Sequence, residues 1–172
     1  GRTVWVLGDQ LNRRIGALAD ATPGEDRVLL VESRTKLEGP RHRQRTHLVV
    51  TALRRFAAEL ESAGFEVDLR SAPTLADGVR AHRRANGGTD VVATEPNSFA
   101  ARRLLEREGV ETVASNQFLC HPSEFQAWAD GRAGRRLRME DFYRWQRVRL
   151  GYLVDGDQPV GGGPKRCRSL RR

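Results

Sequence analysis

The sequence predicts a doubly wound α/β domain on a five-stranded parallel sheet, and two observations carry that prediction. Short apolar runs rich in β-branched and aliphatic residues recur along the chain, and amphipathic stretches at helical spacing separate them. Because strands that alternate with helices need crossover connections, they form a parallel sheet with right-handed crossovers. The expected strands are Thr3–Leu7, Arg27–Ser33, Phe65–Arg70, Thr89–Pro96 and Val110–Ser115.

Each element has its own signal. “GDQLN” breaks the first apolar run, as where a buried strand enters a loop. “FEVDLR” alternates, and Pro96 stops the fourth strand. Apolar residues at helical spacing predict a helix over Arg41–Ala63, which Gly64 ends. “TLADGVRAHRRANGG” predicts a weaker helix, and Ser98 caps another that runs to Glu108.

Beyond residue 116 the alternation stops. “HPSEFQAWADG” predicts a short helix and “RRLRMEDFYRWQRVRLGYL” a longer one, and no strand follows either. Two extra C-terminal helices are therefore expected beside the sheet domain.

Composition limits the function classes. A chain of 172 residues suits one globular domain with a real core. The net charge of +8 favours polyanionic partners, although Lys165, Arg166, Arg168, Arg171 and Arg172 supply much of the excess. No apolar run approaches the roughly 20 residues of a membrane span, and the N-terminus is typical of a first strand, not of a signal peptide. The two cysteines form no metal spacing or disulfide framework, which predicts a reduced, cytoplasmic protein without a metal site.

The turn Gly8-Asp9-Gln10 follows the first strand, where doubly wound sheets bind ligands. Gly8 permits close backbone approach, and Asp9 and Gln10 offer acceptor and donor groups for the edge of a heterocyclic ring. The alternative is a plain turn in which Asp9 caps the next helix. No dinucleotide or P-loop motif is present.

Other charged and aromatic residues have two interpretations each. Glu32 and Glu95 end strands and suggest acid–base chemistry, but carboxylates there more often cap loops. The run “RHRQR” can meet phosphate at a helix N-terminus or form a solvated helical face. The pair Cys120 and His121 is interpreted as structural. The aromatic residues of the last helix predict a packed apolar face more than a platform for stacking bases; they are Phe142, Tyr143, Trp145 and Tyr152.

Several stretches together resemble one family. They are “WVLGDQL”, “HRQR”, “ALRRFAAEL”, “TEP”, “SNQFLCHPSEFQAWADGR” and “RMEDFYRWQRVRLGYLVDGDQPVGG”. In this order they resemble the N-terminal domain of the bacterial photolyase-related proteins, which include iron–sulphur bacterial cryptochromes and prokaryotic (6-4) photolyases. The resemblance covers residues 3–162.

The resemblance implies an α/β domain that carries an antenna chromophore, 6,7-dimethyl-8-ribityllumazine. A larger helical domain of full-length relatives binds FAD and an iron–sulphur cluster and repairs DNA lesions under blue light. By position in the motif, the implied chromophore-binding residues are Gly8, Asp9, Gln10, Glu32 and Lys36.

The end of the chain departs from the family pattern. “GPKRCRSLRR” stands where relatives continue toward the helical domain, so a truncated chain without catalytic activity of its own is expected. The expected parts are an antenna domain over residues 1–137, a connector over 138–162 and a disordered basic tail over 163–172. The helix over 139–153 is then a surface for docking or self-association, and DNA binding is weak or absent. The alternative function is a stand-alone basic module that binds nucleic acid or another partner.

Overall fold

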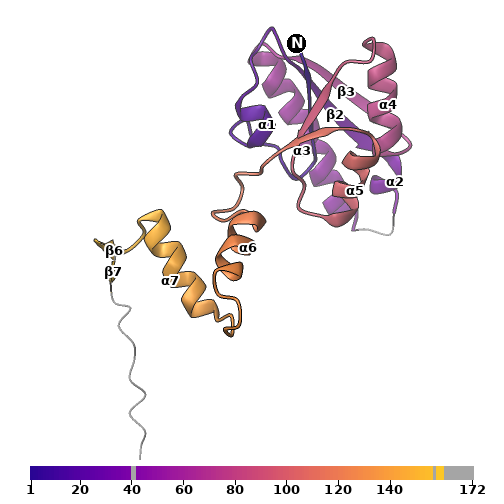
Figure 1. Cartoon of the computed structure of the whole chain (residues 1–172). Helices are drawn as coiled ribbons and strands as arrows, with labels where there is room; N and C mark the ends of the chain where they lie inside the picture. The colour runs from indigo at the N-terminus through magenta and orange to yellow at the C-terminus, as the bar shows by residue number, and fades with distance from the viewer. Residues whose placement is uncertain (40–41, 157, 161–172) are drawn as a thin grey trace, which may run out of the picture. The chain divides into compact units, whose positions relative to one another are not determined.

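The computed structural model describes residues 1–39, 42–156 and 158–160. The chain divides into two compact units, Gly1–Phe118 and Leu119–Arg172. The first unit contains the predicted sheet with its helices, and the second contains two helices and a short hairpin (Figure 1).

The first unit is built on five parallel strands in the order β3-β2-β1-β4-β5. The strands are β1 (Thr3–Val6), β2 (Arg27–Ser33), β3 (Glu66–Ala72), β4 (Val91–Thr94) and β5 (Glu111–Val113). Thr3 of β1 pairs with Arg27 of β2 and with Val91 of β4. The order of the strands reverses between β1 and β4, and such a reversal is where open α/β sheets bind ligands. The predicted fold class is confirmed.

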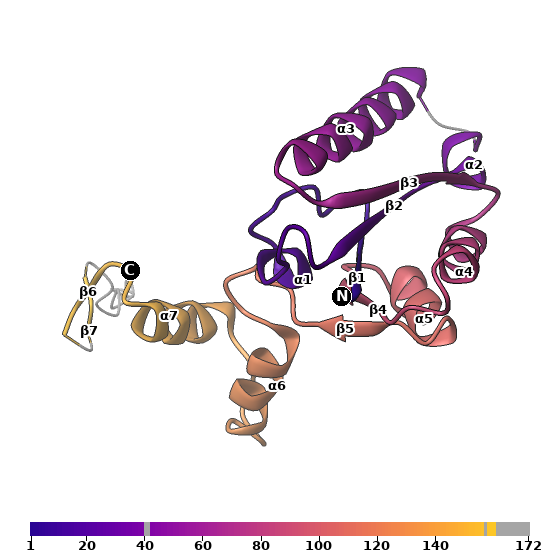
Figure 2. The same cartoon turned by 90° about the horizontal axis from the view of Figure 1, so that it is seen from above.

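Helices cover both faces of this sheet (Figure 2). They are α1 (Gly16–Ala19), α2 (Arg34–Leu37), α3 (Arg43–Ser62), α4 (Leu75–Ala85) and α5 (Phe99–Arg107). Val4 and Val28 point to the face covered by α1 and α3, whereas Trp5 and Leu29 point to the face of α4 and α5. Since successive strand residues alternate between two buried faces, the central strands are continuous apolar runs.

Local signals fix where the helices begin and how closely they pack. The Thr74 and Ser98 side chains cap α4 and α5 by accepting hydrogen bonds from the backbone N–H groups of Asp77 and Ala101. Gly78 brings α4 close to β2, because a Cβ atom there would lie 2.5 Å from Cγ1 of Val31.

A buried polar network joins α4 to the sheet. His82 is fully buried, and its Nε2 lies 2.9 Å from the Thr3 hydroxyl while its Nδ1 lies 2.7 Å from the Asp68 carboxylate. Arg70 also donates to that carboxylate. Burial raises the pKa of Asp68, but the hydrogen bonds from Arg70 and His82 outweigh it, so that this pKa lies below its usual range.

The second unit consists of α6 (Pro122–Asp130), α7 (Met139–Leu150) and the antiparallel hairpin of β6 (Val154–Asp155) and β7 (Gln158–Pro159). The rings of Phe125 and Trp128 on α6 pack against those of Phe142 and Trp145 on α7, with centroids 5.1 to 6.2 Å apart. Of the predicted apolar face, Phe142 and Trp145 are therefore packed on α6. Several other large apolar side chains of this unit are exposed, including Met139, Tyr143, Tyr152 and Leu153.

The structure adds to the elements expected from sequence. All five strands of the parallel sheet and the long helices lie where they were predicted, but the four-residue helices α1 and α2 were not predicted. The expectation that no strand follows the last helix was wrong, because the short hairpin of β6 and β7 comes after α7. His121 caps α6 in a capping box with Glu124, so its predicted structural role is confirmed. The predicted basic tail, residues 163–172, lies outside the described residues. Within the described ranges, no helix is long and apolar enough to cross a membrane.

Candidate ligand-binding site

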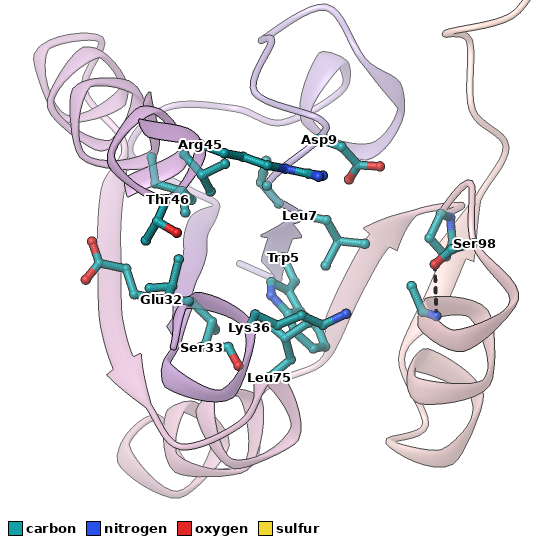
Figure 3. Close-up of a pocket in the computed structure, with 18 residues that line it drawn as sticks. Trp5, Leu7, Asp9, Glu32, Ser33, Lys36, Arg45, Thr46, Leu75 and Ser98 are labelled. Atoms are coloured by element: carbon teal, nitrogen blue, oxygen red, sulfur yellow. Dashed lines mark hydrogen bonds between the residues drawn. The ribbon is translucent and has the colours of Figure 1, made fainter. Parts of the chain in front are cut away.

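A cavity of about 330 Å³ lies at the carboxyl ends of β1 and β2 and extends to the segment after β4 (Figure 3). The ends of β1 and β2 form its base, and the first turns of α3 and α5 contribute to its walls. This size falls in the range of small-molecule sites, and its position spans the reversal of strand order.

Apolar side chains form most of the inner wall. Trp5 and Val31 come from the strands, Leu7 follows β1 directly, and Val49, Leu53 and Leu75 come from α3 and α4. Trp5 is 1% exposed, and its indole nitrogen has no hydrogen-bond partner among the described residues. An unpaired donor in a pocket wall costs free energy unless a ligand acceptor meets it.

The turn after β1 places its three residues differently. Gly8 and Asp9 line the cavity, and a Cβ atom on Gly8 would meet nothing within 4 Å. Asp9 does not cap a helix, because α1 begins at Gly16 after the cap residue Ile15. Gln10 is buried, and its side-chain amide donates to the carbonyls of Thr94 and Glu95. Gln10 thus ties the turn to β4 and does not line the cavity.

Glu32 lines the cavity but is already bonded. It is 8% exposed, and its two carboxylate oxygens accept from Nε and Nη2 of Arg54 at 2.7 and 3.1 Å. Figure 3 shows this carboxylate turned away from Trp5. Glu95 is paired with Arg102 at 2.9 Å. Because arginine side chains already engage both carboxylates, the structure favours structural roles over acid–base chemistry for Glu32 and Glu95.

Two cations stand at the opening of the cavity. Lys36 on α2 and Arg45 on α3 both line it, and Figure 3 shows their side chains extending across the opening, with Arg45 directed toward Asp9. Four of the five predicted residues, Gly8, Asp9, Glu32 and Lys36, are thereby brought to one cavity.

Trp5, Arg45 and Ser98 also line the cavity, although they are not among the five predicted chromophore-binding residues. Trp5 stands inside an apolar run and its polar nitrogen is hidden there, while Arg45 belongs to the “RHRQR” run. Ser98 was expected only as a helix cap, which it is, but it also lines the cavity. The proximity of these residues depends on the order of the strands in the sheet.

No group of three or more His, Cys, Asp or Glu side chains suited to a metal ion occurs in the part of the chain that the structure describes.

The sequence matches the family described as deoxyribodipyrimidine photo-lyase-related protein over residues 4–163. The chain belongs to this photolyase-related family. The family expectation from the sequence motifs is thus confirmed. The chain is also similar to a (6-4) photolyase of Agrobacterium fabrum (strain C58 / ATCC 33970), with 31% identity that covers 92% of this chain. It spans 34% of the length of that relative.

Proposed function

We propose that the first unit is the antenna-chromophore-binding domain of a photolyase-related protein that acts in blue-light-dependent DNA repair or signalling. The observation that carries the proposal is the apolar cavity at the reversal of strand order, lined by four of the residues that the family motif implies. The ligand is a ribityl-lumazine or a flavin-like ring.

The residues of the cavity suit such a ligand. A flat ring fits between the apolar side chains of Leu7, Val31 and Leu53, and the indole N–H of Trp5 supplies a donor for a ring carbonyl. The open space at Gly8 allows the ring edge to approach the backbone. Asp9 accepts from ring N–H or tail hydroxyl groups. When bound, the chromophore absorbs light and passes the excitation to a flavin.

The chain's own task is to bind and orient this ring and to keep water away from it. No residue of the first unit is assigned a catalytic role. In the proposal, FAD, the iron–sulphur cluster and repair of DNA belong to the helical domain that full-length relatives carry.

Titration with 6,7-dimethyl-8-ribityllumazine, followed by absorption and emission, tests the proposal. We expect saturable binding with shifted spectra. Asp9→Ala should weaken binding by about tenfold, because it removes a hydrogen-bonding carboxylate worth on the order of 1.5 kcal/mol. Asp20→Ala is the matched control, since Asp20 is an exposed aspartate outside the cavity. Absence of binding by both lumazine and riboflavin at saturating concentrations would refute the proposal.

A further inference from the structure

Lys36 and Arg45 differ from Arg54 and Arg102 in having no ion pair among the described residues. Arg54 pairs with Glu32 and Arg102 pairs with Glu95. No carboxylate of the described residues lies within ion-pair distance of Lys36 or Arg45. Because Arg54 balances Glu32, the opening of the cavity holds two cations against the one carboxylate of Asp9.

The backbone adds positive potential at the same place. The 20-residue helix α3 and the nine-residue helix α5 both begin at the cavity, where Thr46 and Ser98 line it. Neither helix has an acidic residue in its first turn. The N-terminal end of a helix carries partial positive charge, which favours anions.

A separate observation inside the cavity points to a ligand. Trp5 lines this cavity and is only 1% exposed. Its indole nitrogen has no hydrogen-bond partner among the described residues. The site thus combines an apolar interior with one unpaired donor, and an opening with unpaired cations. A phosphate gains charge-assisted hydrogen bonds from cations at the opening, and these are stronger than the hydrogen bonds that a neutral polyol tail makes.

We propose that the cavity selects a ring ligand whose ribityl tail ends in a phosphate, which Lys36 and Arg45 bind at the opening. This inference rests on the proposed function, because the bound ring directs the tail to the opening. Two cations from separate helices give a dianionic phosphate charge-assisted hydrogen bonds that a tail hydroxyl cannot match.

Two pairs of ligands that differ only in the phosphate test the inference on the full chain. They are riboflavin with riboflavin 5′-phosphate, and 6,7-dimethyl-8-ribityllumazine with its 5′-phosphate ester. For each ring that binds, we expect the phosphorylated member to bind at least about tenfold more tightly at low salt. The preference should shrink as salt is added, because the cations are exposed.

Charge-removing variants assign the effect to residues. In Lys36→Ala/Arg45→Ala the preference should fall to within about twofold. Arg55→Ala/Arg103→Ala is the control, since it removes two exposed arginines that do not line the cavity, and it should keep the preference. Thermal unfolding of both double variants checks that they fold.

The outcomes separate the two proposals. If a ring binds but both members of its pair have equal affinity, the phosphate inference is overturned and the proposed function stands. If the preference persists in Lys36→Ala/Arg45→Ala, the assignment to these residues is overturned. If neither ring binds in either form, both proposals fail.

Discussion

Hydrogen-bonding state separates the residues of the cavity that hold the fold from those available to a ligand. Glu32 is bonded by Arg54, and Gln10 by backbone carbonyls of Thr94 and Glu95. Replacing either residue removes structural bonds as well as any contact to a ligand. Asp9 and the indole N–H of Trp5 are the better probes of binding, because neither side-chain group is committed to the fold.

The carboxylate of Asp68 makes stability depend on pH. Its pKa is lowered in the folded chain, so its contribution is complete above the ordinary aspartate pKa of about 3.9 and is lost as the pH falls below it. Asp68→Asn should lower the free energy of unfolding by about 1 kcal/mol at pH 7, after allowance for solvent screening.

Urea unfolding of the two proteins between about pH 6 and pH 3 measures this effect. The difference between the native chain and Asp68→Asn should narrow toward the acid end, because the unfolded native chain takes up a proton at Asp68 there while the folded chain resists it. Asp90→Asn, at an exposed aspartate, should show no such trend. A difference that stays constant with pH would contradict the role given to Asp68.

At the scale of elements, the contact of α4 with β2 depends on Gly78. Gly78→Ala places a methyl group 2.5 Å from Cγ1 of Val31, a branched side chain on a buried strand. We expect a loss of about 1–3 kcal/mol in the free energy of unfolding, despite the better helix propensity of alanine. Denaturant unfolding measures it.

A second substitution makes the cause explicit. In Val31→Ala/Gly78→Ala the two closest contacts, with Cγ1 and Cγ2 of Val31, are removed, so the double variant should be more stable than the sum of the single effects predicts. Additive effects would show that Gly78 is not a close-packing position.

The same elements show how far the sequence could predict the structure. The central strands were predictable because residues such as Val28 and Leu29 alternate between two buried faces and give continuous apolar runs. The helices α1 and α2 were not, since four residues are too few to show a helical period. The location of the cavity, at the carboxyl end of β1, was predictable from the sequence. Its further lining residues were not, because Arg45 and Ser98 meet β1 only through the order of the strands.

For the whole molecule, the division into two units predicts that the first acts alone. The five strands of the parallel sheet, the helices that cover it and the cavity all lie within Gly1–Phe118. A fragment of these residues should unfold cooperatively and bind lumazine with an affinity within about twofold of the full chain, because the described residues that line the cavity all belong to it. Calorimetry and the spectral titration check both points. A fragment that is folded but does not bind would show that the site needs the second unit.

The most direct test of the central claim is where the ligand binds, and the three tryptophans make it visible. In a ¹⁵N-labelled full chain, each indole N–H gives its own NMR signal. On addition of 6,7-dimethyl-8-ribityllumazine, we predict that the Trp5 indole signal shifts together with the amides of Leu7, Gly8 and Asp9. The signals of Trp128 and Trp145, which pack in the aromatic cluster of the second unit, should stay unchanged. Shifts confined to Trp128 and Trp145, or no shift at saturation, would contradict a chromophore site at the carboxyl ends of β1 and β2.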